Sequence, residues 1–368
     1  MEFGVVLQGY AGCADDALFA EQHGFSMAGF VETPLLAGDP FAWMALAAQA
    51  TKTIKLGTML TIPGIRSAPS TASGLATVNS IAPGRVFCGI GSGYTSRQCL
   101  GLRRPLAASK MRDYASRVRG LLAGEEVFEP VGNVEMPIRL KHQEALRVSN
   151  EQPIPIYIAA DGPKALKAAA EAADGVIMTL RYVTKPADRA EAFGDAVATV
   201  RKLAAERGRD FDDGYVIYST QICILEPGES ALSARALKQI GPFAMTAFHA
   251  YTCTPEIRQF LPAAVSDRLD IYEKEVLSRF DCPRERLYQE VHAGHLSHLL
   301  EGEAAVLTEE LIRMITVTGT PEEIATQLRA VENAGAHNVT LNFAQGTMRE
   351  QIVEVQEQIM PLLARKTA

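Results

Sequence analysis

The sequence predicts an α/β protein that folds as a closed (β/α)8 barrel, the TIM-barrel class, with two insertions. Short apolar runs that end in glycine or polar residues alternate with helix-like segments along the chain. Eight such runs can be counted. The 368 residues also exceed the roughly 250 of a bare barrel and leave room for insertions. A doubly wound open sheet is the alternative architecture.

The first 125 residues contain four strand-helix alternations, the pattern of parallel βα units. The first helix ends at Gly24, a residue typical of a helix C-terminal stop. We expect strands over residues 3–8, 25–32, 53–60 and 85–90, and helices over 14–24, 41–52 and 73–82.

Residues 125–153 break this rhythm with prolines, a Gly-Asn turn signal and short β-like runs, which indicates an insertion that forms a hairpin. The alternation then resumes and is interrupted again by a mostly helical second insertion over 229–316, before the last βα unit. We expect strands over 155–160, 175–180 and 215–225, with helices over 164–173 and 186–207.

The last unit begins with a recognisable helix start. Thr320 is the expected N-cap, Pro321 occupies the first position and Glu323 the third, as in a capping box. An eighth strand follows over 337–344. No polar linker divides the chain, so residues 1–368 are expected to form one domain.

Composition excludes several classes of partner. The net charge is −7 and no run of lysine or arginine could follow a phosphate backbone, so nucleic acid is not expected. The N-terminus lacks the features of a signal peptide, and no apolar run reaches the roughly 18 residues of a membrane span. We therefore expect a cytoplasmic protein without a membrane partner. Its six scattered cysteines predict neither a zinc ribbon nor a disulfide framework.

In a barrel of this kind, the loops after the C-terminal ends of the strands form the active site. That rule selects a short set of segments: Gln8–Tyr10, Glu32–Leu36, Thr58–Pro63, Gly89–Thr95, Ala159–Lys164, Thr179–Tyr182 and Asn342–Gln345.

Two of these segments are glycine loops. GIGSGY at 89–94 follows the fourth strand and is a GxGxG rather than the GxGxxG of a dinucleotide fold. Its glycines would let the backbone approach a flat or anionic ligand, whereas a tight turn without a ligand is the alternative.

The second loop, AADGPKAL at 159–166, places Gly162 and Pro163 at a helix start. Free N–H groups and the helix dipole make this an anion site, to which Lys164 adds charge. The competing interpretation is structural, with Asp161 as an ordinary N-cap.

His292, His295 and His298 are spaced three residues apart, which on a helix brings neighbours to one side. With a carboxylate they could form a metal site, but HExxH is missing and a helix that packs one histidine inward is the simpler explanation, so no metal is predicted.

Four stretches together carry a family resemblance. In order, LGTMLTIPGIRSAP, APGRVFCGIGSGY, PIYIAADGPKALKAAAEAADGVIM and GTPEEIATQLRAVENAGAHNVTL resemble the bacterial luciferase-like superfamily of flavin- and deazaflavin-dependent oxidoreductases. The resemblance extends from the first strand to about residue 345. The fourth stretch and GPKALKAAAEAADG are most similar to the methylenetetrahydromethanopterin reductase-like branch, which uses coenzyme F420.

The resemblance implies a homodimeric barrel that binds an isoalloxazine or deazaflavin ring at its C-terminal mouth. It places a bulge with a non-proline cis peptide behind the ring, within Thr58, Met59 and Leu60. The loop beside the ring would contain Gly91, Ser92 and Gly93. The phosphate loop would contain Ala160, Asp161, Gly162, Pro163 and Lys164.

This chain also departs from the family pattern. Many members carry a histidine after the second strand, where this chain has Glu32 and Thr33; a histidine base at that position is excluded. FMN-using members often have an arginine in the glycine loop, where this chain has Ser92, and the reductase branch tends to have a glutamate where this chain has Val6. The missing arginine favours F420, with FMN as the alternative.

We therefore expect an oxidoreductase that uses F420, or FMN, for hydride transfer to or from a small organic substrate. Glu32 and Tyr94 are the candidates for proton delivery, although a surface ion pair and simple packing would explain them equally well. The alternatives are a reduced-FMN-dependent monooxygenase, a metal-dependent barrel hydrolase or lyase using His292 and His295, and a barrel that binds flavin or deazaflavin without catalysis.

Overall fold

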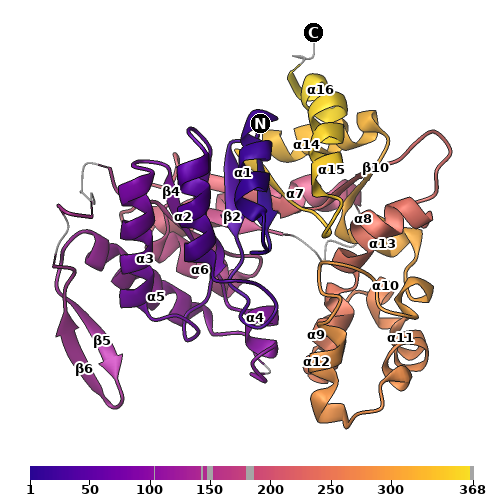
Figure 1. The fold of residues 1–368 in the computed structure, drawn as a ribbon, viewed down its shortest axis with the longest axis horizontal. Coiled ribbons are helices and arrows are strands. Elements are labelled where there is room, and N and C mark those ends of the chain that lie inside the picture. Colours follow the sequence, from indigo (N-terminus) through magenta and orange to yellow (C-terminus); the bar gives the residue numbers. More distant parts are fainter. Residues whose placement is uncertain (103, 142–143, 147–151, 180–185, 365–368) are drawn as a thin grey trace.

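Eight parallel strands close into a barrel in the computed structural model, which describes residues 1–102, 104–141, 144–146, 152–179 and 186–364 (Figure 1). Around the barrel the strand order is β1-β12-β9-β8-β7-β4-β3-β2. The predicted closed barrel is confirmed. Its strands are β1 (Glu2–Leu7), β2 (Met27–Phe30), β3 (Lys55–Thr61), β4 (Val86–Ile90), β7 (Ile156–Ala159), β8 (Gly175–Met178), β9 (Tyr215–Thr220) and β12 (Asn338–Asn342).

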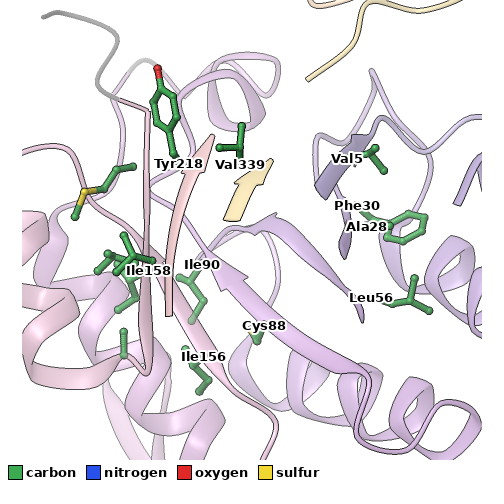
Figure 2. Close-up of a cluster of buried hydrophobic side chains, with 14 of the residues drawn as sticks. Val5, Ala28, Phe30, Leu56, Cys88, Ile90, Ile156, Ile158, Tyr218 and Val339 are labelled. Atoms are coloured by element: carbon green, nitrogen blue, oxygen red, sulfur yellow. The ribbon is translucent and has the colours of Figure 1, made fainter. Parts of the chain in front are cut away.

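Helices surround the strands, and a large hydrophobic cluster lies between the two layers. Figure 2 shows part of this cluster, with side chains such as Phe30, Leu56 and Ile158 coming from different strands. None of the described helices is long and apolar enough to cross a membrane. The outer helices are α1 (Cys13–Gln22), α2 (Pro40–Ala50), α3 (Ala68–Ile81), α5 (Ala108–Leu122), α6 (Pro163–Ala172), α7 (Arg189–Ala205), α14 (Pro321–Asn333), α15 (Met348–Glu354) and α16 (Met360–Ala364).

The barrel interior is filled by side chains from alternate strand positions, as expected for a packed barrel and not a pore. Phe87, Tyr157 and Tyr215 form a stack in which neighbouring ring centroids are 5.6 Å apart. The interior cluster contains Val6, Met27, Met59, Phe87, Tyr157, Ile177 and Ile217. The chemistry of the site therefore has to lie at an end of the barrel.

The first insertion forms the predicted hairpin. Its strands β5 (Val127–Val131) and β6 (Val134–Ile138) pair in antiparallel fashion around Gly132, whose φ of 63° suits the tight turn. Residues 142–143 and 147–151 of this predicted insertion lie outside the described residues, as do residues 180–182 of the predicted loop after β8.

The predicted strand over 215–225 is in fact two strands, which corrects the sequence interpretation. After β9 the chain turns at Gln221, and β10 (Ile222–Ile224) leaves the barrel to pair in parallel with β11 (Val317–Gly319). The Gln221 carbonyl accepts a hydrogen bond from the Val317 amide at 2.8 Å. Continuous apolar residues concealed this break in the sequence.

Between β10 and β11 the chain forms the predicted helical insertion, whose helices lie together beside the barrel (Figure 1). It has a hydrophobic cluster of its own, with Phe243, Phe248 and Tyr272 fully or almost fully buried. Its α-helices are α8 (Ala234–Ala244), α9 (Thr246–Cys253), α10 (Ala263–Ser266), α11 (Leu269–Glu275), α12 (Leu287–Val291) and α13 (Glu309–Ile315).

Candidate active site

The third strand carries a bulge at its C-terminal end. The register between β3 and β4 shifts between Thr58 and Thr61, and the Met59–Leu60 peptide bond is cis, within the segment where the family resemblance placed it. Thr58 anchors the irregular backbone, because its hydroxyl donates to the Gly89 carbonyl at 2.8 Å and accepts from the Gly89 amide at 3.1 Å. Side-chain hydrogen bonds thus stabilise the strand end that faces the mouth.

The glycine loop after β4 packs directly on this bulge. A Cβ atom at Gly91 would lie 2.5 Å from Leu60 Cδ1, and one at Gly93 would lie 2.4 Å from Ile62 Cγ2. Gly93 also has a φ of 77°, which other residues rarely adopt. Close approach between the loop and β3 therefore accounts for these glycines. Contact of Gly91, Ser92 and Gly93 with a ligand stays a prediction.

The start of α6 differs from the structural alternative considered above. The N-cap residue is Gly162, and no side chain caps the helix, so the interpretation of Asp161 as N-cap is wrong. Asp161 instead accepts hydrogen bonds from the Thr179 amide, at 2.7 Å, and from the Thr179 hydroxyl. The loop after β8 holds this carboxylate away from the capping position.

The first turn of α6 consequently fits an anion. Pro163 is at its expected position, Lys164 is exposed, and a Cβ at Gly162 would meet nothing within 4 Å. Ala160 is buried, and its amide donates to the Ile177 carbonyl at 2.9 Å, which fixes the preceding loop. A helix start with open space and a neighbouring ammonium group is suited to a phosphate.

Glu32, at the loop after β2, is 3% exposed and forms a buried ion pair where the sequence suggested a surface one. Its carboxylate accepts hydrogen bonds from the Thr61 hydroxyl at 2.5 Å, the Ile62 amide at 3.1 Å and Arg66 Nε at 2.6 Å. Arg66 also pairs with Asp39. These contacts tie the β2 loop to the end of β3, and the proton-delivery role of Glu32 stays a prediction.

The short helix α4 (Tyr94–Gln98) follows the glycine loop. The Tyr94 side chain is 54% exposed, and its proposed role in proton delivery also stays a prediction. The next two residues link α4 to other parts of the mouth. The Ser96 hydroxyl lies 3.3 Å from that of Thr33 in the loop after β2, and the Thr95 hydroxyl lies 3.0 Å from His295 Nε2 in the insertion.

Three histidines of the insertion lie close together, of which His249 and His292 are buried and His295 is half-buried. His249 Nε2 lies 2.7 Å from Glu303 Oε1, and His249 Nδ1 lies 3.3 Å from His295 Nδ1. The His292 ring is 5.2 Å from that of His295 and 5.8 Å from that of His249. Desolvation by burial, together with the neighbouring His249, lowers the pKa of His292 to about 4, so its ring is neutral at pH 7.

The expectation that residues 292–298 share one side of a helix is wrong. Helix α12 ends at Val291, and Leu296 has a φ of 55°, which a helix cannot accommodate. His298 is exposed, with Nδ1 3.0 Å from the hydroxyl of Ser297. Within the described residues, no group of three or more histidine, cysteine, aspartate or glutamate side chains is arranged to hold a metal ion.

Three residues of the hydrogen-bond networks around Glu32 and His295 were not selected from the sequence: Arg66, His249 and Glu303. Arg66 follows β3 by five residues and could have been found as a basic residue near a strand end. His249 and Glu303 are 54 residues apart and carry no spacing signal, because only the folding of the insertion brings them together.

A cavity of about 370 Å³ lies between α4 and the insertion. Gln98, at the end of α4, lines it together with Thr252 and Tyr288. The Gln98 side chain is 3% exposed, and its Nε2 has no hydrogen-bond partner among the described residues. An unpaired buried amide costs about 1–3 kcal/mol, so a polar ligand group in this cavity would find a donor that is not yet used.

Comparison with protein families places the chain in a known group. Residues 7–338 match the model described as luciferase-like monooxygenase. The chain belongs to this family. The predicted superfamily is thereby confirmed, and with it the expectation of an oxidoreductase.

Two curated relatives of this luciferase-like protein are 5,10-methylenetetrahydromethanopterin reductases. The Methanolobus tindarius protein is 32% identical over 53% of this chain and 56% of the relative. The Archaeoglobus fulgidus protein is 27% identical over 88% of this chain and 87% of the relative. The first match thus spans little more than half of that relative's length.

A solved structure shows the same fold. The coenzyme F420-dependent tetrahydromethanopterin reductase from Methanopyrus kandleri aligns with a TM-score of 0.70, at 21% identity, over 98% of each chain. This likeness confirms the barrel fold of the luciferase-like protein, with its insertions included in the alignment.

Proposed function

We propose that this luciferase-like protein is an F420-dependent oxidoreductase that transfers a hydride between the cofactor at the barrel mouth and a small organic substrate. The uncapped start of α6, with open space at Gly162 and the exposed Lys164, is the observation that carries the proposal. It supplies an anion site for a phosphate-bearing cofactor after β7, which β4 separates from the bulged strand β3. The Archaeoglobus fulgidus reductase, which resembles 88% of this chain, and the coenzyme F420-dependent reductase of Methanopyrus kandleri, which aligns over 98% of it, support the choice of F420.

The residues present fit such a cofactor. The bulge at Thr58, Met59 and Leu60 would lie behind the ring, and Gly91, Ser92 and Gly93 would border it. The loop of Ala160, Asp161, Gly162, Pro163 and Lys164 would hold the phosphate through backbone N–H groups and the lysine. When bound, a deazaflavin exchanges a hydride with a substrate carbon.

Glu32 and Tyr94 remain the proposed groups for proton delivery from the loops after β2 and β4. Glu32 also keeps the end of β3 in place through Thr61 and Arg66. A Glu32→Gln variant tests the first task, because the amide keeps one of the two acceptor oxygens that Glu32 uses but cannot release a proton as a carboxylic acid does. A loss of kcat with an unchanged cofactor Kd is expected for proton delivery, and a weaker Kd would indicate positioning alone.

A reduced-FMN-dependent monooxygenase is the second candidate, and the description of the matching family favours it. The same barrel mouth would serve, with Lys164 at the FMN phosphate. A homodimer in the cytoplasm is our proposal for the assembly and location of the protein. Sedimentation equilibrium of the purified protein tests the dimer.

A fluorescence titration of the purified protein with F420, and separately with FMN, tests the proposed function. Micromolar binding of F420 alone is expected. Preference for FMN would favour the monooxygenase. Binding of neither would contradict both cofactor assignments and leave the fold without a ligand at α6.

A further inference from the structure

A continuous line of hydrogen bonds runs from inside the insertion to the barrel mouth. It begins at Glu303, which is fully buried in the short 3-10 helix η5 (Glu303–Ala305), and passes through His249 of α9 and His295. It ends at the Thr95 hydroxyl, two residues after the glycine loop. The three steps measure 2.7, 3.3 and 3.0 Å.

The order of donors along this line follows from the carboxylate at its end. Ionised Glu303 can only accept, so His249 donates from Nε2 and its Nδ1 is left as an acceptor when the ring is neutral. His295 must then donate from Nδ1, which leaves a lone pair on Nε2. That lone pair faces the Thr95 hydroxyl, which donates to it.

The buried end of the line is fixed. Glu303 also accepts a hydrogen bond from the Leu300 amide at 2.8 Å, and the side chains of His249 and Glu303 are 1% and 0% exposed. A buried carboxylate that holds an imidazole in one tautomer also stabilises the imidazolium form when that ring gains a proton.

The open end is held at the mouth. Leu296, next to His295, adopts a φ of 55°, which is rare for a leucine. Its carbonyl accepts a hydrogen bond at 2.9 Å from Gln8 Nε2, at the end of β1. Unusual backbone angles held by surrounding contacts are frequent at functional sites. The insertion thus places His295 between the loops that follow β1 and β4.

We propose that Thr95, His295, His249 and Glu303 form a second acid–base route of the site, beside the roles proposed for Glu32 and Tyr94. The substrate would be an alcohol, or its carbonyl product in the reverse direction, because the relay takes up a hydroxyl proton while the neighbouring carbon loses a hydride. This inference rests on the proposed function, because the hydride needs a deazaflavin acceptor. In the oxidation, the alcohol O–H proton passes to Thr95 Oγ while the Thr95 proton passes to His295 Nε2. An oxidised deazaflavin, when bound, would accept the hydride from the alcohol carbon as the C=O bond forms.

After this step His295 is an imidazolium, and its Nδ1 proton is shared with His249 next to the Glu303 carboxylate. His249 from α9 and His292 after α12 face His295. Glu303 is the carboxylate of the line and lies behind His249. In the reverse direction the same proton returns to the developing alkoxide through Thr95. Thr95 is the residue that contacts substrate, and the other three act through it.

The first test requires neither cofactor nor substrate. Long-range ¹H–¹⁵N correlation spectra of the protein labelled at histidine report which ring nitrogen carries the proton. We expect Nε2–H for His249 and Nδ1–H for His295. In Glu303→Gln this single tautomer order should be lost, because a carboxamide can donate as well as accept a hydrogen bond. Nε2–H at His295 in wild type, or an unchanged tautomer order in Glu303→Gln, would overturn the relay.

The second test uses the full chain with F420 and a panel of propan-2-ol, butan-2-ol, cyclohexanol and glucose 6-phosphate. Thr95→Val should lower kcat about 100-fold, while the Kd for F420 stays within threefold of wild type. Thr95→Ser, which keeps the hydroxyl, should stay within fivefold. His298→Ala, an exposed histidine of the same segment, should match wild type.

The outcomes separate the two proposals. If wild type does not bind F420, the proposed function fails, and the spectra alone decide whether the relay exists. If F420 binds but no alcohol of the panel is oxidised, the substrate class is overturned. Equal kcat values for the valine and serine variants would remove Thr95 from the relay.

Discussion

Gly162 combines two properties that seldom occur together at a helix start. It occupies an ordinary extended conformation, with φ of −127° and ψ of 163°, and a Cβ there would meet nothing within 4 Å. Neither turn geometry nor packing therefore demands a glycine. The open space in front of α6 is the remaining physical reason for it.

A bulky residue at this position should block a ligand without harming the fold. For Gly162→Leu we expect at least tenfold weaker F420 binding, or about 1.4 kcal/mol, and an unchanged melting temperature. Gly162→Ala is the matched control, since its single methyl group leaves most of the space open. An F420 titration that gives the same Kd for the leucine variant would contradict the phosphate assignment at α6.

His292 gives the protein a pH-dependent stability. Its folded pKa of about 4 lies below the ordinary value of 6.5, mainly because of desolvation. The unfolded chain therefore binds more protons between these values. The stabilising contribution is complete above pH 6.5 and is lost as the pH falls towards 4.

Urea unfolding at pH 7 and pH 5 measures this contribution. His292→Gln should flatten the dependence of the free energy of unfolding on pH by up to about 1.4 kcal/mol per unit in that window. His298→Gln, at an exposed position, should leave it unchanged. Equal slopes for wild type and His292→Gln would show that His292 does not titrate as its burial requires.

The structural role of a residue could be predicted from the sequence only where neighbouring residues in the chain determine that role. Pro163 and Thr320 were assigned correctly because the positions of a helix start are fixed by spacing. The alternative role of Asp161 as an N-cap was wrong because Thr179, which follows the neighbouring strand β8, binds its carboxylate. The link between His249 and Glu303 depends on the tertiary fold of the insertion and leaves no local pattern.

At the scale of elements, α14 contains the complete capping box that the sequence predicted. The Thr320 hydroxyl accepts from the Glu323 amide at 3.3 Å, and the Glu323 carboxylate accepts from the Thr320 amide at 3.0 Å. Thr320→Ala should lower the free energy of unfolding by about 1 kcal/mol. Thr326→Ala is the control: its exposed hydroxyl bonds only to the Glu322 carbonyl within the same helix, and its loss should cost less than half as much.

Strand boundaries were predictable where glycine or proline ends an apolar run, as at Gly91 to Gly93 after β4. They were not predictable at Gln221, where the apolar pattern continues from β9 into β10 although the chain leaves the barrel. Burial on both faces gives the two strands the same composition. The pairing partner, Val317–Gly319, lies almost a hundred residues later, beyond any local signal.

The whole molecule contains separate hydrophobic clusters, one between barrel and helices and another inside the insertion. We expect the two to unfold as separate cooperative units. Phe248→Ala, in the insertion, should cost about 3–5 kcal/mol and accelerate amide hydrogen exchange within residues 229–316 only. Phe193→Ala, in the barrel cluster, should accelerate exchange across the barrel strands. A uniform acceleration by the first variant would show a single cooperative unit.

The parallel pair of β10 and β11 has a consequence for how this protein can diversify. It brings the two ends of the insertion side by side, with Ile222 beside Val317 and Ile224 beside Gly319. The segment between them is therefore joined to the barrel at one place. Replacing this segment would therefore leave the barrel strands unchanged. Because His249, His295 and Glu303 all lie inside it, such a replacement would remove the proposed proton relay and leave the proposed anion site at α6 in place.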